Sequence, residues 1–141
     1  MNAQKFTQKS LEAIQDAQNI AIENNNMQIE QEHLVAALLQ QDNGLIPQLL
    51  KKMNVDPAAV LQQVERKIAQ MPGVTGPGRE AGKIYVAADV DRVLTDAEKE
   101  ADRMKDEYVS VEHVFLALLN HPNASLRELL RTFQVDKNQF L

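Results

Sequence analysis

The sequence is short of the residues that build many kinds of functional site. It has no Cys and no Trp, and aromatic residues make up 4% of its 141 positions. The missing Cys excludes a disulfide scaffold, a thiol nucleophile and thiolate ligation of zinc or an iron–sulfur cluster. The longest nearly apolar run, Leu34 to Leu39, is far too short to span a bilayer, and residues 1–10 lack the apolar stretch of a signal peptide. We therefore expect a cytoplasmic protein with no membrane partner.

Basic residues are also too few and too scattered to follow a phosphate backbone. Fifteen Lys and Arg stand against 20 Asp and Glu, which gives a net charge of -5. We expect no nucleic-acid partner on this ground. The 44% hydrophobic and 25% charged residues are typical of a folded globular protein rather than a disordered tail.

What the chain does contain is an internal repeat. Residues 32–39 read EHLVAALL and residues 112–119 read EHVFLALL, so the second copy follows the first by 80 positions. The same offset of 80 relates LLKKMNVD at 49–56 to LLRTFQVD at 129–136. A duplication without gaps predicts two similar structural units related by an approximate two-fold axis. We place repeat one at about 6–70, a linker at about 71–83, and repeat two at about 84–141, where the last helix is truncated.

Hydrophobic spacing predicts an all-α fold, in which each repeat is a four-helix unit and no sheet is present. Each repeat should open with an amphipathic helix and continue with a buried central helix at 34–39 or 114–119. Capping residues support this order: Thr7 and Ser110 can cap helices, and Asp56 precedes a Pro at the first helical position. Ser125 and Glu128 have the spacing of a capping box for the third helix of repeat two.

Motifs for enzymatic chemistry are incomplete. The linker segment GPGREAGKI lacks the first Gly and the final Ser or Thr of a phosphate-binding loop, so we interpret it as a linker. His33 and His113 occupy equivalent positions in the first turn of a helix, where local hydrogen bonds are a more common role than a metal pair formed across the two-fold axis. The acidic stretch holding Asp102, Asp106, Glu107 and Glu112 is typical of a solvated face, with a cation- or peptide-binding patch as the alternative. The best enzyme hypothesis, an acidic metal-assisted hydrolase, lacks a ligand pattern.

Several segments together resemble the duplicated N-terminal domain of Clp-type AAA+ chaperones. They are FTQKSLEAIQDAQNIAIENNNMQIEQEHLVAALL, the returning DEYVSVEHVFLALL and the MPGVTGPG linker, and the resemblance covers essentially the whole chain. The linker and the KDEYVS stretch are most similar to the ClpB-type disaggregases. The resemblance implies a non-catalytic module that binds unfolded or aggregated polypeptide. It also implies that ATP and magnesium act in downstream rings of a homo-hexameric parent that works with a co-chaperone system. The alternative is an adaptor- or substrate-docking domain of a ClpC/ClpA-type unfoldase.

The resemblance also implies site residues. Thr7, Asp106 and Glu112 match positions that ClpB-type proteins use in substrate handling, and Glu32 is the repeat-one equivalent of Glu112. In ClpC-type relatives both glutamates contribute to recognising phosphorylated arginine, but Ala87 stands here where those relatives often keep a second Thr.

The resemblance further implies a groove for substrate. ClpB-type domains bind exposed hydrophobic segments of other polypeptides in an apolar groove on the first two helices of repeat two. The matching positions in this sequence are Asp96, Glu100 and His113, which are all polar or charged. This difference suggests that binding relies on acidic contacts or on other apolar positions. No metal site and no cofactor site is expected within the chain itself.

Overall fold

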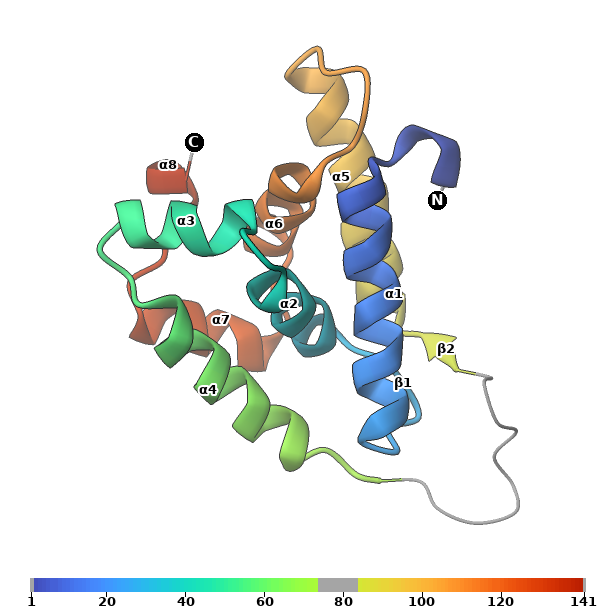
Figure 1. Cartoon of the computed structure of the whole chain (residues 1–141), viewed down its shortest axis with the longest axis vertical. Helices are drawn as coiled ribbons and strands as arrows, with labels where there is room; N and C mark the ends of the chain where they lie inside the picture. The colour runs from blue at the N-terminus through green and yellow to red at the C-terminus, as the bar shows by residue number, and fades with distance from the viewer. Residues whose placement is uncertain (1, 74–83, 141) are drawn as a thin grey trace.

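The structure is a computed structural model that describes residues 2–73 and 84–140. Within these residues the chain forms one turn of 3-10 helix, eight α-helices and two short strands (Figure 1). In chain order they are η1 (Ala3–Lys5), α1 (Gln8–Glu23), β1 (Gln28–Ile29), α2 (Gln31–Gln40), α3 (Leu45–Lys52), α4 (Pro57–Ala69), β2 (Tyr85–Val86), α5 (Ala88–Arg103), α6 (Val111–Asn120), α7 (Ala124–Thr132) and α8 (Lys137–Phe140). The prediction of an all-α architecture with four helices in each repeat is confirmed.

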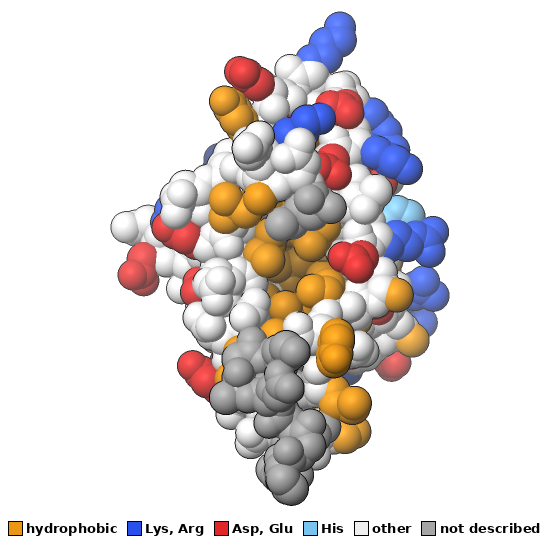
Figure 2. All heavy atoms as spheres, turned by 90° about the vertical axis from the view of Figure 1, so that its right-hand side faces the viewer, with side chains coloured by type: hydrophobic (Ala, Val, Ile, Leu, Met, Phe, Trp, Pro, Cys, Tyr) orange, Lys and Arg blue, Asp and Glu red, His pale blue; other side chains and the backbone are white. Residues whose placement is uncertain are grey.

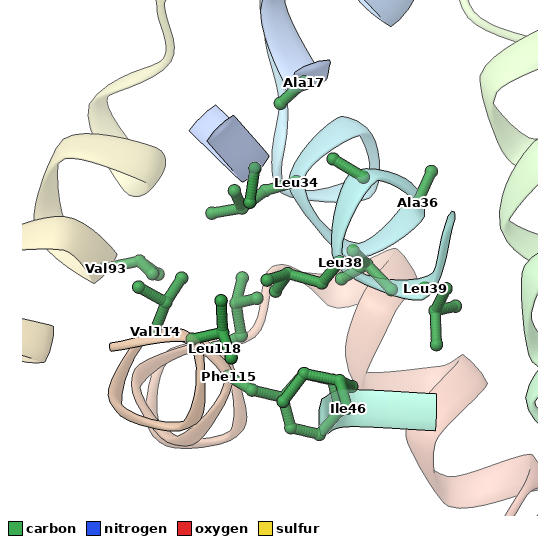
Figure 3. Close-up of a cluster of buried hydrophobic side chains, with 14 of the residues drawn as sticks. Ala17, Leu34, Ala36, Leu38, Leu39, Ile46, Val93, Val114, Phe115 and Leu118 are labelled. Carbon is green, nitrogen blue, oxygen red and sulfur yellow. The ribbon is translucent and has the colours of Figure 1, made fainter. Parts of the chain in front are cut away.

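The two central helices, α2 and α6, form the middle of the molecule. α1 packs on α2, α5 packs on α6, and the two central helices also contact each other. Leu34 and Leu38 of α2 and Leu118 of α6 are almost completely buried (Figure 3). The apolar runs of the sequence therefore become one core that both repeats share.

Backbone geometry repeats with the same offset as the sequence. Asn25 and Lys105 both have positive φ values, 57° and 58°, at the end of the first helix of each repeat. Asn54 and Gln134 have φ values of 62° and 57° after the third helix. Left-handed residues are uncommon outside Gly, so these two pairs show that the repeats share backbone conformation after their first and third helices. The loop before the third helix differs, because Asn43 has a φ of 52° and its equivalent Asn123 a φ of -69°.

A short strand pairing departs from the predicted absence of a sheet. β1 and β2 pair in parallel, with Ile29 opposite Val86, and an isolated parallel bridge joins Phe6 to Val109. Phe6 and Val86 are equivalent residues, as are Ile29 and Val109, so each repeat lends one segment to the other. The prediction of no sheet is wrong in this detail because two-residue strands are too short to show alternating hydrophobicity.

Most predicted helix caps are confirmed. Thr7 and Asp56 accept hydrogen bonds from the backbone N–H groups of Ser10 and Ala58, and Ser110 is the N-cap of α6. The capping box at Ser125 is wrong: the N-cap of α7 is Asn123, two residues earlier, and its side chain accepts a 2.7 Å hydrogen bond from the N–H of Leu126. An Asn directly before the helix satisfies the first free N–H groups, so no second cap is needed.

Most of the predicted linker lies outside the described residues. These undescribed positions include the segment GPGREAGK that was compared with a phosphate-binding loop. Among the described residues, no helix combines the length and the apolar character needed to cross a membrane.

Candidate functional site

Thr7 lies where the first repeat meets the second. Its backbone N–H donates to the carbonyl oxygen of Val109 at 2.9 Å, and its side chain caps α1 through Ser10. The buried hydroxyl of Ser10 lies 3.0 Å from the same carbonyl oxygen. Thr7 therefore has a structural role at the junction, and its half-buried side chain borders the segment that leads from Asp106 to α6.

Asp106 is bound to a buried imidazole. The Nε2 atom of His113 lies 2.8 Å from one carboxylate oxygen of Asp106, and the side chain of Asp106 is 46% exposed. The Nδ1 atom of His113 accepts from the backbone N–H of Ser110 at 2.9 Å, so the ring proton is assigned to Nε2, which donates to Asp106. His113 thus orients Asp106 while leaving much of its carboxylate in contact with solvent.

His33 repeats this arrangement with an uncharged partner. Its Nδ1 atom accepts from the backbone N–H of Glu30 at 2.8 Å, and its Nε2 atom lies 2.8 Å from the side-chain oxygen of Asn26. Burial lowers the pKa of His33 from 6.5 to about 4. Both histidines therefore make the local hydrogen bonds predicted for them. Among the described residues, no group of three or more His, Cys, Asp or Glu side chains is arranged to hold a metal ion.

Glu112 lies in an apolar groove between the repeats. The groove has a volume of about 280 Å³ and is lined by Leu45, Leu49, Met104, Glu112, Leu116 and Phe140. Leu45 and Leu49 come from α3 of repeat one, whereas the remaining residues come from repeat two. A half-buried carboxylate beside aliphatic side chains can bind a segment that combines apolar and basic residues.

Glu32, the repeat-one equivalent of Glu112, is held inside the molecule. It is only 2% exposed, and its two carboxylate oxygens accept hydrogen bonds from the side-chain amide of Asn123 at 3.0 and 3.2 Å. Burial raises the pKa of Glu32 above its usual 4.5, and the bond from Asn123 opposes that shift. A ligand could reach Glu32 only if Asn123 moved away.

The polar positions predicted to line a groove are bound largely to neighbouring side chains. The side-chain amide of Asn120 donates to Asp96 at 3.0 Å and to Glu100 at 3.2 Å, and Arg103 pairs with both carboxylates. Asp96 and Glu100 are 8% and 5% exposed. They form one network between α5 and α6, whereas the third predicted position, His113, is bound to Asp106.

A second apolar surface lies beside the strand pair. Met27 and Tyr85 are 68% and 75% exposed, and both line a hollow of about 500 Å³ together with Asn26, Gln28, Glu30, Met71 and Pro72.

On the face of the molecule drawn in Figure 2, hydrophobic side chains gather in a central hollow, and Lys and Arg side chains follow one edge. Exposed hydrophobic surface of this kind is typical of sites that bind other polypeptides.

The sequence was compared with models of known protein families. A family model described as the Clp repeat (R) N-terminal domain matches residues 5–133. The chain belongs to this family. The resemblance inferred from the Glu-His-apolar runs is therefore confirmed.

Curated relatives of this Clp repeat domain are chaperones. It is 39% identical over 142 residues to the chaperone protein ClpB of Nitratidesulfovibrio vulgaris, a match that covers 100% of this chain and 16% of that protein. It is 38% identical over 141 residues to ClpB of Bacillus anthracis, again with 100% of this chain and 16% of the relative covered. The chain therefore spans about one sixth of the length of these relatives.

Solved structures share the fold of the Clp repeat domain. The crystal structure of the Hsp104 N-terminal domain from Candida albicans superposes with a TM-score of 0.82 at 23% identity, covering 96% of this chain and 86% of that one. The N-terminal domain of ClpD from Arabidopsis thaliana gives a TM-score of 0.75 at 17% identity, with 99% and 92% covered. These TM-scores show a common fold.

Sequence reasoning missed the residues that distinguish the two glutamates of the Clp repeat domain. Asn123 covers Glu32, whereas Leu45 and Leu49 of α3 border Glu112. The position of Asn123 directly before a helix was a usable signal for a cap, but its second contact with Glu32 spans 91 positions and has no local signature.

Proposed function

We propose that this Clp repeat domain binds unfolded or aggregated polypeptide and passes it to the AAA+ rings of a ClpB-type disaggregase. The relatives named ClpB match along the whole chain and extend well beyond it. The observation that carries the proposal is the apolar groove with the carboxylate of Glu112 on its wall. Unfolded chains expose the aliphatic and basic side chains that such a groove accepts, whereas folded proteins bury most of their aliphatic side chains.

Weak binding is consistent with this function. The groove at Glu112 has Phe140 as its one aromatic lining residue, and aromatic anchors usually carry much of the binding energy at tight interfaces. A domain tethered to a larger assembly needs little affinity, because the tether raises the local concentration of its ligand. In this proposal the domain has no catalytic role, and ATP and magnesium act in the rings of a cytoplasmic hexamer.

Thr7, Asp106 and Glu112 are the proposed contacts. Asp106 presents a partly exposed carboxylate held in place by His113, and Glu112 supplies a second charge in the first turn of α6. Thr7 is hydrogen-bonded to Val109 and so borders the same segment. Glu32 contributes in this proposal only when Asn123 is displaced, so Asp106 and Glu112 of repeat two supply the accessible carboxylates.

An NMR titration with reduced, carboxyamidomethylated lysozyme, a permanently unfolded protein of basic net charge, tests the proposal. We expect localised shifts at Thr7, Asp106 and Glu112, and weaker binding by Asp106→Asn and Glu112→Gln. Asp106→Asn keeps an oxygen that can accept from His113, as Asn26 does for His33, so it removes charge without removing the bond. Asp16→Asn, on the exposed face of α1, is the matched control. Shifts confined to another face, or equal weakening by the control, would contradict the site.

A further inference from the structure

A third hollow lies on repeat two, away from the groove at Glu112. Its volume is about 410 Å³, and its lining includes the aliphatic residues Leu119, Leu130 and Val135 and the basic residues Arg127, Arg131 and Lys137. The aliphatic residues come from α6, α7 and the loop after α7. Its one carboxylate, that of Asp136, already accepts a 3.0 Å hydrogen bond from the backbone N–H of Asn138 at the start of α8.

Three basic residues line this hollow. Arg127 and Arg131 lie one turn apart on α7, both exposed, and Lys137 begins α8. Within the described part of the chain, none of these three side chains belongs to an ion pair. Three cations beside one occupied carboxylate make a locally positive surface on a chain whose net charge is -5.

The internal repeat shows that the fold does not require these cations. The aliphatic residues of the hollow have identical equivalents eighty positions earlier, in repeat one. These are Leu39, Leu50 and Val55. The equivalents of Arg127, Arg131 and Lys137 are Pro47, Lys51 and Pro57, so repeat one has one cation where repeat two has three. Pro122, on the loop, is Asp42 in repeat one. The third helix of repeat one therefore forms with one of the three cations that line the hollow in repeat two.

We propose that this hollow of repeat two docks an acidic polypeptide segment that also carries an aliphatic side chain. The carboxylates of the segment would pair with Arg127, Arg131 and Lys137, and its aliphatic group would contact Leu119, Leu130 and Val135. A polypeptide fits better than single-stranded nucleic acid because no aromatic ring lines the hollow to stack on a base. Arg side chains also suit paired recognition of carboxylates.

This surface is separate from the proposed substrate contacts. None of its lining residues is Thr7, Asp106 or Glu112, and it prefers the opposite charge in its ligand. A domain with both surfaces would hold a segment with apolar and basic residues at one site and an acidic segment at the other.

Fluorescence anisotropy with the 141-residue chain tests the proposal. The probe is a fluorescein-labelled peptide of alternating Asp and Leu, compared with the matched Asn and Leu peptide and with an oligothymidylate. The test variant is Arg127→Glu with Arg131→Glu. The control is Lys51→Glu with Lys52→Glu on α3, which changes the net charge by the same amount and includes the repeat-one equivalent of Arg131. Far-ultraviolet circular dichroism is used to check that each variant is folded. If the variant with Arg127→Glu and Arg131→Glu does not fold, the variant with Arg127→Gln and Arg131→Gln takes its place.

We expect the test variant to bind the acidic peptide about tenfold more weakly, with the control close to the parent chain. Added salt should weaken binding by the parent chain. Three results would overturn the proposal. They are an equal loss of affinity for the acidic peptide in the test and control variants, an affinity that does not change when Arg127 and Arg131 are replaced, and an equal affinity of the parent chain for the Asn and Asp peptides. Tighter binding of oligothymidylate that depends on the same arginines would instead identify a nucleic-acid site and also overturn it.

Discussion

His33 should make the stability of the domain fall as the pH drops. The ring is fully buried, and its Nδ1 atom accepts a hydrogen bond from the backbone N–H of Glu30. Protonation of Nδ1 would place its new N–H group against the N–H of Glu30. The hydrogen bond between them, which caps α2, would then be lost. Burial lowers the pKa of His33 to about 4 in the folded domain, from 6.5 in the unfolded chain.

The sign and size of the effect follow from these two pKa values. Between pH 6.5 and about 4 the unfolded chain binds a proton at His33 and the folded domain does not, so acid favours unfolding. The free energy of unfolding should therefore be about 2 kcal/mol lower at pH 5 than at pH 7 through His33 alone. The loss approaches about 3 kcal/mol at still lower pH.

Urea unfolding of the parent chain and of His33→Gln at both pH values isolates this contribution. The variant is less stable at every pH because it lacks the ring, so the quantity to compare is the change between the two pH values. We expect that change to be smaller in His33→Gln by about 2 kcal/mol. Glu32 acts in the opposite direction, since its raised pKa lowers stability as the pH rises above 4.5, but it is present in both proteins.

Nitrogen chemical shifts of the ring give a direct second measurement. They should show His33 as the neutral Nε2–H tautomer throughout the range between pH 5 and 7. A titration of His33 near 6.5 in the folded domain, or an equal loss of stability in both proteins, would contradict the assignment of the ring as a neutral cap.

Other substitutions test further parts of the structure by urea unfolding. Asn123→Ala should cost about 2 to 4 kcal/mol, because it removes the cap of α7 and the hydrogen bonds to Glu32; a loss below 1 kcal/mol would argue against that double role. Leu126→Ala should cost about 2 to 5 kcal/mol, since Leu126 is 1% exposed. Lys105→Gly should stabilise the domain by about 0.5 to 1 kcal/mol by relieving its positive φ, and Asn25→Gly should stabilise it less because Asn tolerates that conformation. Equal changes in stability for Lys105→Gly and Asn25→Gly would contradict the argument that Asn tolerates a positive φ better than Lys does.

The repeat made most of the fold predictable from the sequence. The offset between EHLVAALL and EHVFLALL correctly identified two equivalent units, and the hydrophobic runs correctly located the buried central helices α2 and α6. Caps such as Thr7 and Asp56 were predictable because their hydrogen bonds reach only two or three residues along the chain.

Features that depend on the other repeat were not predictable. Glu32 and Glu112 have the same local sequence, yet one is covered by Asn123 and the other lies in a groove beside α3. The pairing of Phe6 with Val109 likewise depends on how the repeats meet, and a single bridge leaves no periodic pattern in the sequence. Within repeat two, the network of Asp96 and Glu100 with Asn120 was not predictable either, because residue type alone does not show that a carboxylate is buried and hydrogen-bonded.

The reciprocal pairing of Phe6 with Val109 and of Val86 with Ile29 has a consequence for how the molecule comes apart. A single repeat would lose its partner segment and expose backbone groups that the other repeat now satisfies. Either half would then be expected to associate with a copy of itself or with the other half. A chain cut between the repeats should consequently reassemble from its two fragments, as a split protein does, and the intact chain should unfold in one cooperative step.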